Sequence, residues 1–343
     1  MTTNSLKLEY ALKQHLVSNR SSLKKGISMV ELSILDGGMG LELFKQGVPE
    51  DRILWSARAL VDEQYHQKVI DVHQSYLDAG SSYLTTNNYA VIPGYLEKAG
   101  ITDRLPELTK LAGRLALQAK NEWLEKNAGI QKDIKVLGCL PPLIESYRPD
   151  LVLNSQEAIA YYQVIAECLE QYVDLFLLET MSSLGEALSG AKVASNSGKG
   201  WFISWTLNER GMLRSGECIN ESISTFLNEG FIPDAIMFNC SAPESITLGL
   251  KNLSQEVRGL LDSKNIALGA YANNFSSEPD VDATVEHSAP LGTRFDVTPD
   301  RYLEFATQWH DMGCRLIGGC CGISPQYIAR LSAIKDKESA RLN

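Results

Sequence analysis

The sequence lacks an excess of basic residues and lacks long apolar runs. Its 343 residues carry 32 Lys and Arg against 42 Asp and Glu, which gives a net charge of −10. This balance excludes a polyanion-binding role, so we expect neither nucleic acid nor a membrane surface as a partner. No apolar run approaches the roughly 18 residues that a membrane-spanning helix needs. With 44% hydrophobic and 22% charged residues, the composition is typical of a soluble folded protein.

Leader and nucleotide-binding motifs are missing too. The chain opens without a positively charged segment leading into an apolar stretch, and its seven cysteines are odd in number. Secretion and a disulfide framework are therefore disfavoured, and we expect a cytoplasmic protein. No G-x-G-x-x-G follows the first expected strand, and no G-x-x-x-x-G-K-[ST] occurs, so a nucleotide phosphate site has no support.

The chain from residue 31 to 338 alternates short apolar runs with longer segments of helical period, which is typical of βα units. The expected strands are Leu32–Asp36, Tyr83–Thr86, Ile134–Cys139, Leu175–Glu179, Phe202–Thr206, Ala235–Cys240, Ala267–Tyr271 and Arg315–Gly318. The expected helices are Asp62–Ala79, Leu105–Lys126, Ser155–Tyr172, Ser183–Asn196, Glu217–Asn228, Ala242–Leu261, Pro299–Met312 and Pro325–Lys337.

Eight such units predict an α/β fold, a single (β/α)8 TIM barrel occupying residues 31–338. An open doubly wound sheet has the same count, but the absence of a phosphate motif favours the barrel. Residues 1–30, with an amphipathic stretch at Leu6–Val17, form an N-terminal extension that we expect to be a helical appendage. The long irregular segment Asn273–Val297 is typical of a functional cover or a disordered loop.

Polar and metal-binding residue types end the expected strands, and in a barrel these ends meet at one rim. They include Cys240 after the sixth strand and Cys320 with Cys321 after the eighth. Three thiolates leave one position open on a zinc ion, as in catalytic zinc sites. Spacing alone leaves open an accidental cysteine doublet or a strained vicinal disulfide. The other cysteines are expected to pack as small buried hydrophobes; they are Cys139, Cys168, Cys218 and Cys314.

Five segments together resemble the homocysteine S-methyltransferases. They are Asp36–Gly40 (DGGMG), Thr85–Tyr89 (TTNNY), Leu178–Thr180 (LET), Asn239–Cys240 (NC) and Gly318–Gly322 (GGCCG). This family includes S-methylmethionine-dependent enzymes, betaine–homocysteine methyltransferase and the homocysteine module of cobalamin-dependent methionine synthase. The resemblance runs from about residue 32 to residue 333.

The resemblance implies one Zn²⁺ per chain, held by Cys240, Cys320 and Cys321, with the homocysteine sulfur in the open position. It also implies catalytic Asp36 and Glu179, which bind the amino group of homocysteine. The remaining substrate-binding positions are the backbone at Gly37, Gly38 and Met39 for the carboxylate, and Trp55, Tyr89 and Thr180 on the methyl-donor side. Aromatic faces attract the cationic centre of such a donor.

Two segments depart from the family pattern, at Gly138–Arg148 and at Tyr271–Asn274, and both flank the expected donor pocket. Thr180 stands where betaine users carry tyrosine, which favours a sulfonium donor, S-methylmethionine first and S-adenosylmethionine second. The expected reaction is zinc-dependent methylation of homocysteine to methionine. Two alternatives remain: a homocysteine module that takes its methyl group from a corrinoid partner protein, and a non-catalytic zinc- or thiol-binding barrel.

Overall fold

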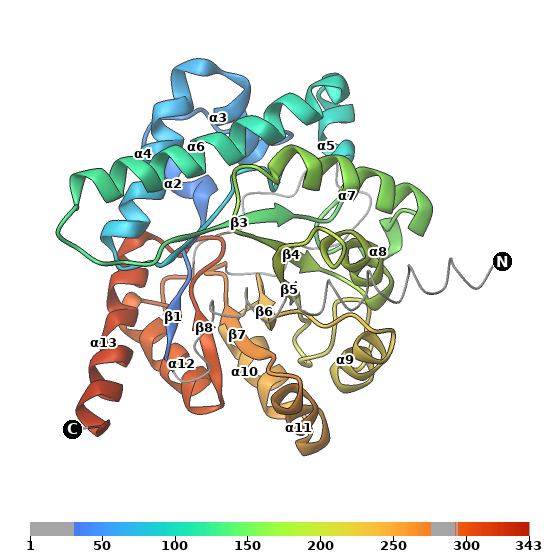
Figure 1. The fold of residues 1–343 in the computed structure, drawn as a ribbon, viewed down its shortest axis with the longest axis vertical. Helices are drawn as coiled ribbons and strands as arrows, with labels where there is room; N and C mark the ends of the chain where they lie inside the picture. Colours follow the sequence, from blue (N-terminus) through green and yellow to red (C-terminus); the bar gives the residue numbers. More distant parts are fainter. Residues whose placement is uncertain (1–30, 276–291, 293, 343) are drawn as a thin grey trace, which may run out of the picture.

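A computed structural model describes residues 31–275, 292 and 294–342, and Figure 1 shows its strands at the centre with helices around them. The strands are β1 Ser33–Ile34, β2 Tyr83–Thr85, β3 Lys135–Leu140, β4 Leu175–Met181, β5 Gly200–Trp205, β6 Ala235–Asn239, β7 Ala267–Tyr271 and β8 Cys314–Ile317. They form one sheet in the order β1-β8-β7-β6-β5-β4-β3-β2, and every pairing is parallel. This cyclic order confirms the (β/α)8 barrel and rejects the open doubly wound sheet.

The barrel closes between β1 and β2 through few contacts, because β1 is only two residues long. The backbone amide of Ser82 donates to the carbonyl of Ile34 at 2.8 Å. Next to it, the Asp36 carboxylate accepts the amide of Thr85 at 2.6 Å and its hydroxyl at 3.0 Å. A predicted substrate-binding residue is thus also part of the seam that closes the barrel.

The helices cover the outside of the sheet (Figure 1). They are α2 Met39–Lys45, α3 Arg58–Val61, α4 His66–Asp78, α5 Pro93–Lys98, α6 Leu105–Lys126, α7 Ser155–Leu169, α8 Leu184–Ala194, α9 Ile219–Asn228, α10 Pro243–Asn252, α11 Gln255–Ser263, α12 Pro299–Asp311 and α13 Pro325–Leu342. The single helix expected over Ala242–Leu261 is wrong. The chain breaks at Leu253, and the Ser254 hydroxyl caps a second helix by accepting the amide of Val257 at 3.2 Å.

Side chains alternate across each strand, so the sheet separates two apolar cores. Outward side chains such as Phe176 and Leu178 pack beneath the helices. Inward side chains fill the barrel, and they include Leu35, Tyr83, Leu137, Leu177, Phe202, Met237, Tyr271 and Leu316. Because Glu179 is two residues beyond Leu177, the same alternation turns its carboxylate into the barrel interior, near the carboxyl ends of the strands.

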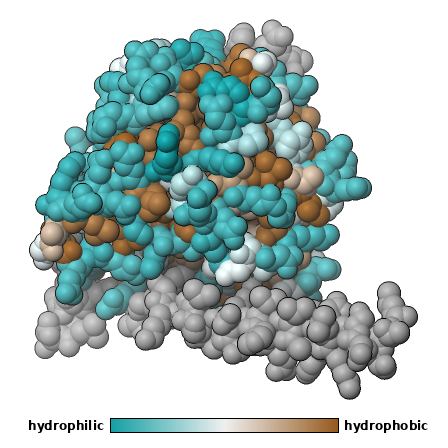
Figure 2. Space-filling view, turned by 45° about the horizontal axis from the view of Figure 1, so that its top comes forward, coloured by the Kyte–Doolittle hydropathy of each residue, from teal (hydrophilic) through white to brown (hydrophobic). Residues whose placement is uncertain are grey.

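Figure 2 shows mainly hydrophilic residues in this view, with hydrophobic ones visible between them. The exposed large hydrophobic side chains are scattered over separate loops and helices; they are Ile53, Ile130, Val164, Leu248 and Phe295. In the part of the chain that the structure describes, no helix combines the length and the apolarity needed to cross a membrane.

Two expectations fall outside the described residues. The helical appendage at residues 1–30 is one of them, and most of the segment Asn273–Val297 is the other. The described ends of that segment do contact the barrel, since the Asn274 amide donates to the carbonyl of Cys321 at 2.8 Å.

Candidate metal and homocysteine site

The three predicted metal-binding cysteines come together at the carboxyl end of the barrel. Cys240 follows β6 directly, whereas Cys320 and Cys321 lie on the loop after β8. Their Sγ atoms all lie within 4.8 Å of one another, and those of Cys240 and Cys321 are 3.7 Å apart. All three cysteines are free in this structure.

The sulfur spacing fits a tetrahedral ion. Thiolates at about 2.3 Å from zinc stand about 3.8 Å apart in a tetrahedron, close to the 3.7 Å between Cys240 and Cys321. The thiols of Cys320 and Cys321 hold the pKa of Cys240 well below its ordinary range, and hydrogen bonding to Cys240 raises the pKa of Cys320. Without a cation the cluster therefore keeps protons that a divalent ion would displace.

The extension of β7 fixes both halves of the cluster. The Cys240 amide donates to the carbonyl of Tyr271 at 3.2 Å, and the Cys320 amide donates to the carbonyl of Ala272 at 2.9 Å. Gly38 lies against the other side of the loop, where a Cβ on it would stand 2.7 Å from the Cys320 carbonyl oxygen. Close backbone approach therefore requires glycine at this position.

A buried hydrogen-bonded layer supports the cysteines from inside the barrel. Asn239 accepts the Ser204 hydroxyl at 2.7 Å and donates to the Thr180 hydroxyl at 2.8 Å. The same Asn239 amide group lies 4.0 Å from the sulfur of Cys320. Because buried polar side chains of this kind are fixed by their partners, the layer orients the site rather than merely filling space.

Two buried carboxylates lie beside this layer. Glu179 accepts the thiol of Cys139 at 3.2 Å, and burial raises the pKa of Glu179 to about 8. Burial likewise raises the pKa of Asp36 to about 7, although hydrogen bonds from Thr85 oppose the rise. The negative charge of Asp36 contributes to the raised pKa of Glu179, so the two carboxylates share one environment. A bound ammonium group would relieve both desolvation and repulsion.

These raised pKa values predict a pH effect on stability. In metal-free protein, folded Glu179 and Asp36 hold protons that the unfolded chain releases near pH 4. Their contribution to the free energy of unfolding therefore falls as the pH rises from about 4 to about 8. In chelator-treated protein, we expect Glu179→Gln to gain stability over wild type as the pH rises through this range. Denaturant unfolding at pH 5 and pH 8.5 measures it, and a constant difference between the two proteins would contradict the prediction.

In the glycine motif Asp36–Gly40 after β1, the amide of Gly38 already has a hydrogen-bond partner within the protein. The Gly38 amide donates to the carbonyl of Ile323 at 3.1 Å, and the Tyr76 hydroxyl donates to that same carbonyl at 3.0 Å. Met39 begins helix α2, whose first turn has no side-chain cap from Gly38. The first-turn amides that begin at Met39 are thus better placed than that of Gly38 to meet a carboxylate.

The predicted donor-side residues occupy neighbouring loops. The Trp55 indole packs against Gly40 of α2, where a Cβ added to the glycine would stand 2.7 Å from the indole Nε1 atom. The indole also packs edge-on against Phe44. The Tyr89 hydroxyl lies 2.7 Å from the Ser146 hydroxyl. Burial, and then the charge of Cys240, raises the pKa of Tyr89 well above its ordinary value. Trp55 and Tyr89 are both half-buried.

Backbone strain is concentrated at this site. Five described residues other than glycine have positive φ, and four of them are Trp55 (47°), Tyr147 (63°), Thr180 (60°) and Cys240 (45°). The fifth, Asn265, follows a helix end, where such angles are common. Bulky and β-branched residues adopt positive φ only where the surrounding structure imposes it, and functional sites are where this occurs.

The sequence interpretation missed Tyr147, Cys139 and Thr85 as parts of the site. The Tyr147 hydroxyl donates to the sulfur of Cys240 at 2.8 Å, and this residue lies in the segment Gly138–Arg148 that departs from the family pattern. That departure was the available signal for Tyr147. Cys139 was expected to pack as a buried thiol, and it is buried, but it also donates to Glu179.

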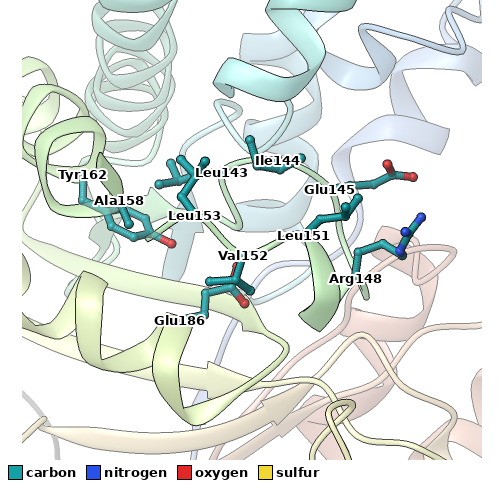
Figure 3. A pocket seen from close by; sticks show the side chains of 10 residues that line it. All are labelled: Leu143, Ile144, Glu145, Arg148, Leu151, Val152, Leu153, Ala158, Tyr162 and Glu186. Carbon is teal, nitrogen blue, oxygen red and sulfur yellow. The ribbon is translucent and has the colours of Figure 1, made fainter. Parts of the chain in front are cut away.

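Figure 3 shows a pocket whose lining includes none of the predicted site residues. Its lining comes from the loop after β3 together with Ala158, Tyr162 and Glu186 of α7 and α8. The cavity measures about 10 Å³, which is the lower limit for holding one water molecule. It cannot hold an amino acid, so the substrate site is argued from the cysteines and carboxylates.

Fold and site define a class: a (β/α)8 barrel with three converging cysteines and two buried carboxylates at the carboxyl end of its strands. A model of the homocysteine S-methyltransferase family matches residues 33–334. The chain belongs to that family and is a methyltransferase. It is 27% identical to the homocysteine S-methyltransferase of Escherichia coli (strain K12) over 92% of this chain and 99% of that one.

Two further similarities cover most of the chain. Homocysteine S-methyltransferase 1 of Arabidopsis thaliana is 26% identical over 88% of this chain and 92% of its own length. The metallated crystal form of the homocysteine methyltransferase MmuM from Escherichia coli superposes with a TM-score of 0.72, at 25% identity. That alignment covers 92% of this chain and 98% of the solved one.

Proposed function

We propose that this enzyme transfers a methyl group from a sulfonium donor to homocysteine bound at one zinc ion per chain, giving methionine. S-methylmethionine is the first candidate donor and S-adenosylmethionine the second. The observation that carries the proposal is the convergence of Cys240, Cys320 and Cys321, with sulfurs within 4.8 Å of one another, beside the buried carboxylates of Asp36 and Glu179. We place the enzyme in the cytoplasm, because free thiols such as those of Cys240, Cys320 and Cys321 are typical of a reducing compartment.

The homocysteine side uses charge and backbone. Cys240, Cys320 and Cys321 would hold the zinc, which when bound deprotonates the homocysteine thiol and keeps its sulfur nucleophilic. Glu179 and Asp36 hold the substrate ammonium through charge-assisted hydrogen bonds. The backbone around Gly37, Gly38 and Met39 receives the carboxylate through the first-turn amides of α2, because the Gly38 amide already donates to the carbonyl of Ile323.

The donor side uses aromatic faces. In the transfer step a bond forms between the methyl carbon and the homocysteine sulfur while the donor's S–CH₃ bond breaks. The donor leaves as a neutral thioether, so its positive charge disappears during the reaction. Trp55 and Tyr89 attract such a cation only modestly, which avoids overstabilising the ground state. Thr180, with its hydroxyl held by Asn239, leaves room where a tyrosine would narrow the pocket.

A donor screen tests this proposal. Purified zinc-loaded enzyme is mixed with homocysteine and, in separate reactions, with S-methylmethionine, S-adenosylmethionine, betaine or methylcobalamin, and methionine is measured. We expect the highest kcat/KM with S-methylmethionine. A preference for betaine would overturn the sulfonium assignment, and transfer from methylcobalamin alone would favour the corrinoid-partner alternative. Zinc binding without any transfer would favour a non-catalytic barrel.

Replacing Trp55 by alanine tests the donor pocket. Because the indole face would contact the sulfonium, we expect Trp55→Ala to lower kcat/KM for S-methylmethionine by about tenfold or more, on a scale of about 1.4 kcal/mol per tenfold. Zinc content and homocysteine affinity should stay unchanged. Trp55→Phe is the matched control, since it keeps an aromatic face against Phe44. Full donor efficiency in the alanine variant would rule out this role.

A further inference from the structure

We infer that Tyr147 donates a hydrogen bond to the Cys240 thiolate of the metal-loaded enzyme, and that this bond strengthens metal binding. This inference rests on the proposed function, in which Cys240 is one of three zinc ligands, and it adds a residue outside the ligand set. In the structure the Tyr147 hydroxyl donates to the Cys240 sulfur at 2.8 Å. The bond crosses the rim of the barrel, from the loop after β3 to the residue after β6.

The chemistry of the two groups fixes the direction of this bond. A phenol has an ordinary pKa of about 10, so the Tyr147 hydroxyl carries its proton near neutral pH. A cysteine that binds a metal is a thiolate, which has no proton to donate and can only accept. Hydrogen bonds to an ionised acceptor are roughly twice as strong as those between neutral groups. Tyr147 is therefore the donor and Cys240 the acceptor of a strong bond.

The backbone holds both partners in conformations that the surrounding structure must support. Tyr147 has a φ of 63° and Cys240 a φ of 45°, a region that side chains of this size seldom adopt. The Cys240 amide donates to the carbonyl of Tyr271 at 3.2 Å, which ties this residue to the end of β7. Strain of this kind persists where neighbouring contacts fix the chain, so the two side chains meet in a geometry set in advance.

The loop that carries Tyr147 is anchored on a second side. The hydroxyl of the preceding residue, Ser146, lies 2.7 Å from the hydroxyl of Tyr89. The Gly94 amide of α5 donates to the carbonyl of Leu143 at 3.1 Å. A phenol held in this way keeps its hydroxyl near one sulfur without losing further conformational freedom when a metal binds. Tyr147 is thus a positioning residue for a metal ligand.

A hydrogen bond to a metal-bound thiolate favours the loaded site for a second reason. Three protein thiolates and the homocysteine sulfur carry more negative charge than a divalent ion neutralises. A donor to one of these sulfurs offsets part of the excess. Within the described part of the chain, the bond from Tyr147 is the shortest from a side-chain donor to any of the three cysteine sulfurs. The Asn239 amide is 4.0 Å from the Cys320 sulfur, a longer and weaker contact.

The test is Tyr147→Phe, which removes the hydroxyl but keeps the ring, whose centre lies 4.8 Å from the guanidinium carbon of Arg214. Competition with a coloured chelator measures zinc affinity without any substrate. We expect Tyr147→Phe to bind zinc about 10- to 100-fold more weakly than wild type. Tyr162→Phe is the matched control, because the Tyr162 hydroxyl also contacts a sulfur, that of Met181 at 3.9 Å, outside the cysteine cluster. Zinc affinity should not change in the control.

Cobalt(II) bound in place of zinc supplies a spectroscopic readout. The thiolate-to-cobalt charge-transfer band moves to lower energy when a thiolate loses a hydrogen bond, because its electrons become easier to transfer. We expect this band to shift to longer wavelength in Tyr147→Phe and to stay in place in Tyr162→Phe. Neither the zinc competition nor the cobalt spectrum requires a methyl donor or turnover.

A purely structural role for the hydroxyl gives a different result. In that case Tyr147→Phe would lower the melting temperature of metal-free protein and keep wild-type zinc affinity with an unshifted cobalt band. That outcome would overturn the inference while leaving the proposed function intact. Absence of zinc binding by the wild-type protein would instead reject the proposed function, and the inference with it.

Discussion

Replacing Cys320 by alanine is expected to remove bound zinc and to lower methyl transfer by about a thousandfold or more. The three sulfurs lie within 4.8 Å of one another, and two thiolates cannot complete the tetrahedral set that the substrate sulfur joins. With no metal bound, homocysteine stays mostly protonated near neutral pH, because a free thiol has a pKa of about 8.5.

Metal analysis and a methionine assay check this expectation together. Cys218→Ser serves as the matched control, since Cys218 is a free, half-buried thiol at the start of α9 and does not belong to the cluster of three cysteines. The control should keep one zinc per chain and its activity. One zinc per chain and full activity in Cys320→Ala would show that Cys320 is not a zinc ligand.

Glu179→Gln is expected to weaken homocysteine binding by about 2 to 4 kcal/mol, or roughly 30- to 900-fold, without releasing zinc. The carboxylate is buried in the barrel interior, its pKa is raised to about 8 by that burial, and a bound ammonium would compensate its charge. The glutamine keeps the shape of the side chain but removes the charge.

Calorimetric titration of homocysteine into zinc-loaded protein measures the change. Glu186→Gln is a matched control, because Glu186 is also buried and burial also raises its pKa. Its carboxylate, in the first turn of α8, accepts the amide and the hydroxyl of Ser182 instead. Homocysteine affinity should not change in the control. If Glu179→Gln binds homocysteine as wild type does, Glu179 does not clamp the ammonium.

Asp36→Asn should weaken homocysteine binding as well, but the structure adds a second effect. Asp36 accepts both the amide and the hydroxyl of Thr85 where β1 and β2 close the barrel. We therefore expect a lower melting temperature in Asp36→Asn. A loss of homocysteine affinity with unchanged thermal stability would show that the seam does not depend on this carboxylate.

The hydrophobic periodicity of the sequence predicted where the strands and helices lie, but it predicted their first and last residues less exactly. The strand expected at Leu32–Asp36 shortens to Ser33–Ile34, and Asp36 lies beyond it. The strand expected at Leu175–Glu179 instead extends to Met181 through an irregularity in its pairing with β5. Such irregularities depend on the neighbouring strand, so a pattern read along one chain cannot reveal them.

The cysteine cluster was predictable, but its supporting contacts were not. Cys240 and Cys320 are 80 residues apart, and the motif residues together with the barrel count were enough to place them at one rim. The bond from Cys139 to Glu179 and the bond from Tyr147 to Cys240 join residues 40 and 93 positions apart. Neither pair carries a spacing signal, because such contacts arise from how loops of different units fold over the rim.

The amino-acid sequence was enough to predict the barrel and the acidic residues at the strand ends, because hydrophobic period and residue chemistry are local properties of the chain, and the family resemblance singled out the three cysteines. The bonds by which Asp36 closes the barrel, and the bond from the Tyr147 hydroxyl to the Cys240 sulfur, became visible only in the folded structure. Those relations depend on the distances between strand ends and on backbone angles that the packed barrel imposes. They come into existence only when all eight units are assembled.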